Sequence, residues 1–135
     1  MRAEAVRARI RAAFDAALEK KADGVEVLDL RGLSSITDYF LICHGNSRRQ
    51  VQAIVEEIQE CLGDLRVHPD HVEGNQEAEW VLMDYIDFVV HVFTPERRAF
   101  YGLERLWADA PHLEFLPKSR ATRAAARRRL RSPSE

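Results

Sequence analysis

The sequence predicts one α/β domain, a mixed β-sheet flanked by helices. Three observations predict it. The length of 135 residues suits a single domain. A composition of 46% hydrophobic and 31% charged residues is typical of a globular chain. Segments with helical and strand-like patterns follow in the order helix, strand, strand, helix, weak strand, strand, strand, helix. No run of about 18 apolar residues occurs, so we expect no membrane-spanning helix.

The first half of the chain contains two helical and two strand-like segments. Apolar residues fall at helical spacing over 3–20, and residues 25–30 are strand-like. The continuous apolar run 39–44 is typical of a strand buried on both faces. Ser47 is a favourable N-cap for a second helix, which we expect to end at Gly63. Residues 66–74 form only a weak strand, because Pro69 cannot donate a hydrogen bond.

Residues 80–85 and 87–93 are the clearest strand pair, and we expect them to form a hairpin. A two-residue turn centred on Tyr85-Ile86 would favour Gly or Asn, so we expect a four-residue loop. Opposed residue numbers then sum to 171, which places a large aromatic, a His and two carboxylates on one face. The opposed pairs on that face are Trp80 with His91, Leu82 with Val89, and Asp84 with Asp87.

A final helix is expected after Thr94, with Thr94 as its N-cap and Pro95 at its first position. Its apolar face comprises Phe100, Leu103, Leu106 and Trp107. Together, the patterns predict a core that draws on every major element. The expected core residues are Val6, Phe14, Phe40, Ile42, Ile54, Ile58, Val81, Val90, Leu103 and Leu106.

Charge divides the chain into an acidic body, residues 1–117, and a basic tail, residues 118–135. The body carries 13 basic and 21 acidic side chains, a net charge of −8, and the tail has a net charge of +6. We therefore expect a domain over 1–117 followed by a flexible tail. An acidic body repels phosphate, so it favours a basic partner over nonspecific nucleic-acid binding.

The N-terminal segment has neither the apolar core of a signal peptide nor the acid-poor composition of a mitochondrial transit peptide. The two cysteines, Cys43 and Cys61, indicate a reducing compartment rather than a disulfide scaffold. We therefore expect a cytoplasmic protein that is not bound to a membrane.

The hairpin face offers two interpretations that the sequence leaves open. Trp80 among carboxylates is typical of a recognition patch, since aromatic residues anchor interfaces, but it is equally compatible with a core residue. Asp84 and Asp87 could hold a metal or act as an acid/base pair. Because Asp is common in turns, we prefer the interpretation that both are turn residues.

Two further segments carry weaker signals. His68-Pro69-Asp70-His71 lacks a standard ligand spacing, so we predict no metal site there. Gly45-Asn46-Ser47 lies where a strand leads into a helix, a place where anions dock, but an ordinary turn is favoured. No nucleophile or phosphate-loop motif is present. We therefore predict no catalytic residues, metal or cofactor.

A series of segments in the body resembles the ribosomal silencing factor family, also called the Iojap family. Each segment is short, but their order and spacing over about residues 5–110 are specific. The segments are Ser34-Ser35-Ile36-Thr37-Asp38-Tyr39-Phe40, Gly45-Asn46-Ser47, His71-Val72-Glu73-Gly74, Trp80, Asp84-Tyr85, Asp87, Val90-His91-Val92-Phe93, Arg97, Tyr101, Leu103-Glu104 and Leu106-Trp107.

The resemblance implies a fold similar to that of nucleotidyltransferases and a protein that binds the large ribosomal subunit through its fourteenth protein. Occupying that surface would block joining of the small subunit and repress translation in starved or stationary cells. The resemblance also allows a homodimer. The contact surface that it implies overlaps the hairpin face, and the candidate partner-binding residues are Trp80, Asp84, Tyr85, Asp87, His91 and Phe93.

Two features depart from the family pattern. Members of the family often have Gly where Ile86 stands, which implies an altered hairpin turn. The Arg-rich tail lies outside the resemblance, and its charge would suit weak contact with ribosomal RNA.

The alternative function is a metal-dependent nucleotidyltransferase. It is weakened because Asp84 and Asp87 have the wrong spacing for two carboxylates on one strand face. A dimeric adaptor with another partner remains a third interpretation.

Overall fold

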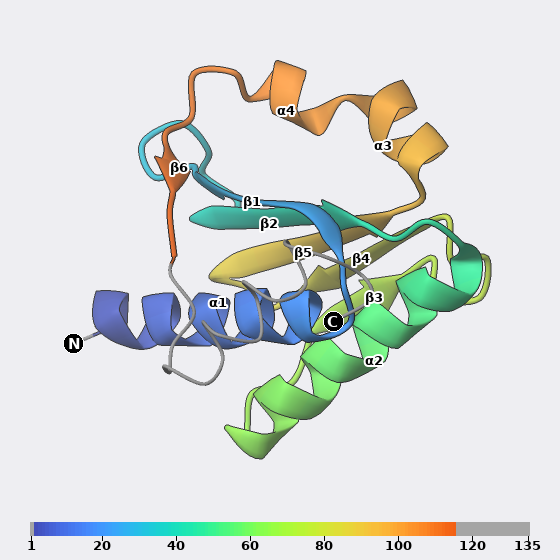
Figure 1. Cartoon of the computed structure of the whole chain (residues 1–135). Coiled ribbons are helices and arrows are strands. Elements are labelled where there is room, and N and C mark those ends of the chain that lie inside the picture. Colours follow the sequence, from blue (N-terminus) through green and yellow to red (C-terminus); the bar gives the residue numbers. More distant parts are fainter. Residues whose placement is uncertain (1, 116–135) are drawn as a thin grey trace.

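Three layers make up the computed structural model, which describes residues 2–115. Helices α1 (Arg2–Glu19) and α2 (Arg48–Asp64) cover one face of a six-stranded sheet, and α3 (Pro95–Tyr101) and α4 (Leu103–Leu106) lie over the other face (Figure 1). The expected mixed sheet covered by helices is confirmed. The expected tail, 118–135, lies outside the described residues.

The sheet contains β1 (Asp23–Asp29), β2 (Tyr39–His44), β3 (His71–Glu73), β4 (Trp80–Asp84), β5 (Phe88–Phe93) and β6 (His112–Leu113), in the spatial order β3-β4-β5-β2-β1-β6. Strands β2 and β5 pair in parallel, and the other neighbours pair antiparallel. As the continuous apolar run predicted, β2 is central, with Leu41 and Cys43 in the core under α1 and α2 and Ile42 in the core on the opposite face.

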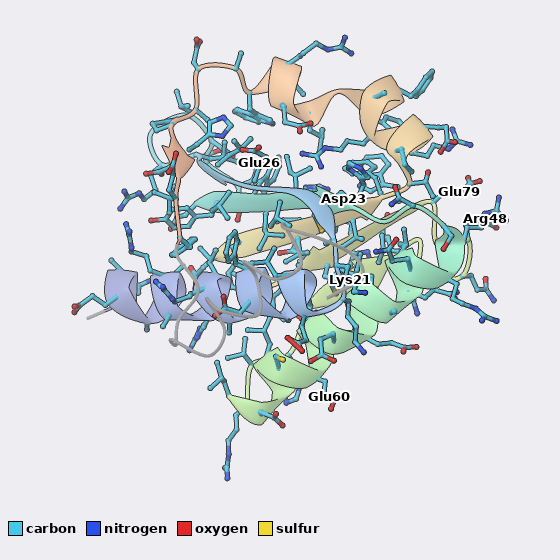
Figure 2. All side chains as sticks on the ribbon, in the orientation of Figure 1. Lys21, Asp23, Glu26, Arg48, Glu60 and Glu79 are labelled. Carbon is cyan, nitrogen blue, oxygen red and sulfur yellow. The ribbon has the colours of Figure 1, made fainter. Side chains whose placement is uncertain are left out.

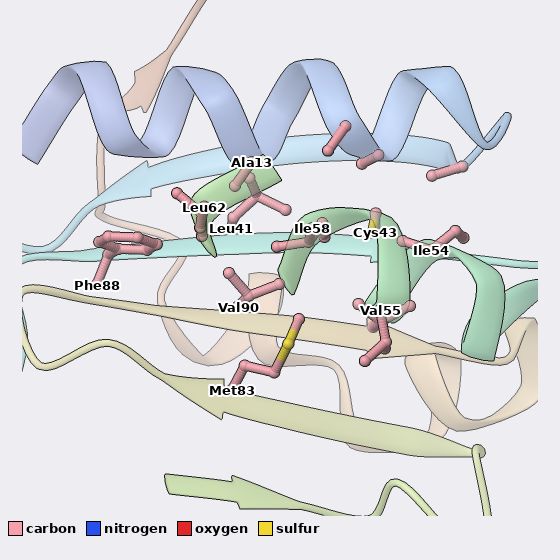
Figure 3. Packing of buried hydrophobic residues seen from close by; sticks show 14 of the residues in the cluster. Ala13, Leu41, Cys43, Ile54, Val55, Ile58, Leu62, Met83, Phe88 and Val90 are labelled. Carbon is pink, nitrogen blue, oxygen red and sulfur yellow. The ribbon is translucent and has the colours of Figure 1, made fainter. Parts of the chain in front are cut away.

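The larger core fills the space between the sheet and α1 and α2. Residues Ile54, Ile58 and Leu62 recur at helical spacing on α2 and are fully buried over β2, β4 and β5 (Figure 3). Six of the ten expected core residues are buried. Phe14, Phe40 and Leu103 are partly buried against the core.

Leu106 is 72% exposed, so its assignment to the core is wrong. The expected final helix is interrupted at Gly102, whose φ of 56° is left-handed. This break ends α3 and starts α4 in a new direction, which changes the side that Leu106 faces. Thr94 is the N-cap of α3, as expected, but its side chain makes no capping hydrogen bond.

The boundaries of α2 are partly as expected. Ser47 caps the helix, because its Oγ accepts a hydrogen bond from the Gln50 N–H at 3.1 Å. The expected end at Gly63 is wrong: the helix continues to Asp64, and Arg66 takes the left-handed conformation, with φ 63°. The weak strand expected over 66–74 is reduced to the three residues of β3, at the edge of the sheet.

The β4–β5 hairpin forms, but its predicted register is wrong. Opposed numbers sum to 173: Trp80 pairs with Phe93, and Asp84 pairs with Val89. The N–H of Tyr85 donates to the Phe88 carbonyl at 2.9 Å, which leaves a two-residue loop in place of the expected four. The register moves by two residues, so each strand keeps its inward and outward faces.

In the described part of the chain, no helix is long and apolar enough to cross a membrane.

Candidate functional site

Trp80 lies at the start of β4 and is half-buried among aromatic side chains. Its indole stacks on Phe93, with ring centroids 5.2 Å apart, and contacts Tyr101 of α3 at 4.4 Å. Its Nε1–H donates a hydrogen bond to Nδ1 of His91 at 3.1 Å. A Trp that is packed on one side and accessible on another combines the two interpretations that the sequence left open.

His91, which accepts this hydrogen bond, lies on the buried side of the indole and is 3% exposed. Burial lowers the pKa of His91 to about 3, so the ring is neutral at physiological pH. Since Nδ1 accepts from Trp80, the ring proton resides on Nε2, which has no partner among the described residues. Through the hydrogen bond that it accepts, His91 fixes the orientation of the Trp80 indole.

The two carboxylates of the hairpin lie at its turn. Asp84 Oδ1 accepts a hydrogen bond from the Ile86 N–H at 2.8 Å. The Asp87 carboxylate pairs with the exposed guanidinium of Arg2, at the N-terminus of α1. Asp84 opposes Val89 in the ladder and not Asp87, so the expected opposition of the two carboxylates is wrong. Asp87 lies in the two-residue turn, as the sequence favoured, whereas Asp84 is the last residue of β4 and contacts the turn only through its side chain.

The six candidate partner-binding residues do not share one exposed surface. Trp80 and Asp84 are partly exposed, and the Asp87 side chain is 17% exposed. Phe93 and His91 are buried beneath Trp80. Tyr85 points to the opposite layer and joins the core under α1 and α2, where burial raises its pKa to about 12. Period-two alternation from Trp80 already placed residue 85 on that other face.

The sequence missed two exposed aromatic side chains of α3: Tyr101, which contacts Trp80, and Phe100, which contacts Tyr101. It placed Phe100 on the buried side of a continuous helix, and it did not single out Tyr101 as a surface residue. In the structure, Phe100 is 72% exposed and Tyr101 43% exposed, and neither α3 nor α4 has a buried residue. The signal that could have found them is Gly102, which interrupts the helical pattern.

The Gly45-Asn46-Ser47 turn borders a pocket that also contains Arg48, Glu79 and Arg97. Glu79 accepts hydrogen bonds from Arg48 at 2.5 Å and from Arg97 at 3.2 Å. Figure 2 shows Glu79 beside Arg48. The hydrogen bond from Arg48 is the main reason that the pKa of Glu79 lies below its usual value. Both cations in the pocket are therefore already paired with a carboxylate, and the segment serves as the strand-to-helix turn that the sequence favoured.

Residues 2–115 contain no group of three or more His, Cys, Asp or Glu side chains placed to hold a metal ion. In the His68–His71 segment, His71 pairs with Glu73 at 2.5 Å.

A nucleotidyltransferase would need a phosphate-binding turn, for which Gly45-Asn46-Ser47 is the candidate, close to the hairpin carboxylates. The structure does not bring these two segments together. Gly45 donates to the Phe93 carbonyl at one end of the parallel pair β2–β5, whereas the Asp87 carbonyl accepts from the Asp38 N–H at the other end. The Gly-Asn-Ser turn and the hairpin carboxylates therefore occupy opposite ends of the sheet.

Comparison with known proteins decides the family. The model of the family described as "ribosomal silencing factor during starvation" matches residues 3–135. The chain belongs to the ribosomal silencing factor family. The match includes the tail, which the sequence resemblance had left outside.

Individual relatives agree with this assignment. The chain is 48% identical to the ribosomal silencing factor of Halalkalibacterium halodurans over 103 residues, covering 76% of this chain and 88% of the relative. It is 50% identical to that of Bacillus subtilis over 93 residues, covering 69% and 79%. A crystal structure of a Bacillus halodurans protein, 43% identical, matches 78% of this chain and 96% of its own with a TM-score of 0.70.

Proposed function

We propose that this protein binds the large ribosomal subunit through the subunit's fourteenth protein and sterically blocks association with the small subunit. This action would repress translation during starvation or in stationary phase, in the cytoplasm. No bond is made or broken. Support comes from family membership, which indicates a ribosome-associated regulator, and from the acidic body, which suits a basic ribosomal protein.

The main support for this contact surface is Trp80, which is half-buried and held in one orientation. An aromatic anchor held by stacking and a hydrogen bond loses little freedom on binding, which is typical of interface hot spots. Asp84 and Asp87 supply negative charge at the other end of the hairpin. We propose that Phe93 and His91 act beneath Trp80 as its support, and that Tyr85 holds the hairpin onto the body.

Two additional contacts belong to the proposal. The basic tail would add a weak, salt-sensitive contact with ribosomal RNA. A homodimer is also compatible with the family resemblance, and sedimentation of the free protein would detect it.

The test combines sedimentation with purified subunits and a light-scattering assay of subunit joining. Trp80→Ala should weaken large-subunit binding about 30-fold or more, as expected for loss of a hot-spot aromatic. Trp107→Ala is the matched control, since the Trp107 ring packs against Phe40 of β2 and not in the aromatic cluster of Trp80 with Phe93 and Tyr101. Circular dichroism and thermal melting establish that both variants are folded.

The charge contribution is tested with Asn substitutions. Asp84→Asn keeps the Oδ1 acceptor for the Ile86 N–H, whereas Lys would break that turn. Combined with Asp87→Asn, it should slow association and reduce the block on joining. The control, Glu60→Gln with Asp64→Asn, makes the same charge change on α2. If the Trp80 and Asp variants all bind like wild type, the hairpin is not the recognition face.

A further inference from the structure

The turn between β4 and β5 holds a β-branched residue in a left-handed backbone conformation. Ile86 has a φ of 73°. The Asp87 N–H donates to the Tyr85 carbonyl at 2.9 Å and closes a γ-turn around it. At this φ the Cβ atom crowds the adjacent carbonyl, so a β-branched residue is strained where Gly would be relaxed.

Neighbouring groups hold the turn in this conformation. Besides the hydrogen bond from Ile86 N–H to Asp84, the Thr37 hydroxyl donates to the Ile86 carbonyl at 3.1 Å. The Asp38 N–H donates to the Asp87 carbonyl, also at 3.1 Å. A strained residue persists only where its surroundings determine it in this way, and such residues concentrate at functional positions.

The side chain that causes this strain contributes little to packing. Ile86 is 61% exposed, and Ile36, next to the Thr37 that bonds to the turn, is 87% exposed. Leu33 of the same loop is 47% exposed. The hydrogen bond between Thr37 and Ile86 joins the loop that contains Ile36 and Leu33 to the β4–β5 turn, and we call Ile86, Ile36 and Leu33 the tip patch. Single exposed aliphatic residues are common, but several of them on joined loops around a strained turn favour a contact surface.

We propose that the tip patch is an apolar contact for the basic ribosomal partner, with Ile86 at its centre. The inference rests on the proposed function and extends the contact surface to residues that the sequence did not single out. Two features indicate which partner would cover the tip patch: it is continuous with the hairpin, and carboxylates flank it. Ile86 lies between Asp84 and Asp87. Because the Asp87 carboxylate pairs with Arg2, the partly exposed Asp84 carboxylate is the group that would attract a basic partner, and a partner at Asp84 would also lie against the turn. An apolar centre with a charged rim is the usual anatomy of a protein interface.

The test compares Ile86→Gly with Ile86→Ala. Gly removes both the side chain and the strain, whereas Ala removes most of the side chain but keeps the strained Cβ. Binding to purified large subunits should weaken about five-fold or more in both variants. The melting temperature of Ile86→Gly should exceed that of Ile86→Ala. Leu65→Ala is the control: Leu65 is 53% exposed at the end of α2, and its loss should not change binding.

Three results would overturn the inference. Ile86→Gly could bind like wild type, or it could melt at or below the temperature of Ile86→Ala, which would mean that the turn is unstrained. Self-association could fall with Ile86→Gly while subunit binding stays unchanged, which would assign the patch to a second copy. If Trp80→Ala weakens binding in the same assay, such results remove only the tip patch. If it does not, the proposed function fails as well.

Discussion

Gly74, between β3 and β4, should be irreplaceable because of its contact with the strand that carries Trp80. A Cβ atom added at Gly74 would lie 2.0 Å from the Trp80 carbonyl oxygen, and the φ of Gly74 is 82°. Gly32 has nearly the same φ, 83°, but nothing lies within 4 Å of its added Cβ. The two glycines therefore separate the cost of the backbone conformation from the cost of the clash.

The expected magnitudes differ several-fold. At Gly32, Ala costs about 1–2 kcal/mol for a left-handed φ, offset by roughly 0.4–1 kcal/mol from the stiffer unfolded chain. The net loss is about 0.5–1 kcal/mol. At Gly74, the clash with backbone adds about 1–3 kcal/mol of overpacking, which gives about 2–4 kcal/mol in total. The melting temperature should fall by roughly 6–16 °C for Gly74→Ala and by only a few degrees for Gly32→Ala.

Urea unfolding measures both variants, with the denaturant slope as a check on two-state behaviour. Because the clash falls on the backbone of Trp80, Gly74→Ala should also change the Trp fluorescence in a Trp107→Phe background. Equal stability losses in the two Ala variants would refute the close approach of Gly74 to β4.

Four other predictions follow from burial, charge and pKa. Ile58→Ala should destabilise the fold by about 2–5 kcal/mol, and Phe100→Ala, at a 72% exposed position, by no more than about 0.5 kcal/mol in urea unfolding. The folded-state pKa of His91 is about 3, below the ordinary 6.5, so the unfolded chain binds more protons between these two pH values. The free energy of unfolding should therefore fall as the pH decreases from 6.5 towards 3. In His91→Asn, the free energy of unfolding should depend less on pH over this range. Burial raises the thiol pKa of Cys43 to about 12 and that of Cys61 to about 11, so neither should react with a disulfide reagent at pH 8 before unfolding; fast labelling would contradict this. Removing residues 118–135 should leave the melting temperature unchanged and reduce the salt dependence of ribosome binding; an unchanged salt slope would assign the tail no role.

The sequence determined the elements whose patterns depend on local chemistry. The apolar stripe of α2, its Ser47 cap and the central position of β2 follow from periodicity and capping, which neighbouring residues encode directly. Alternation along the hairpin also predicted which side chains share a face with Trp80, because a shift of two residues leaves the faces unchanged.

The tertiary structure decided what depends on backbone conformation at single residues. Whether the hairpin has a two- or four-residue loop depended on Ile86 adopting a φ that its own side chain opposes. The Thr37 hydroxyl, which donates to the Ile86 carbonyl, and the Asp84 carboxylate, which accepts from the Ile86 N–H, hold it there. The exposure of Phe100 and Leu106 depended on the break at Gly102. In both places the deciding contacts come from distant segments or from one left-handed residue. Hydrophobic periodicity predicts neither distant contacts nor a single left-handed residue, because it averages over a window of neighbouring residues.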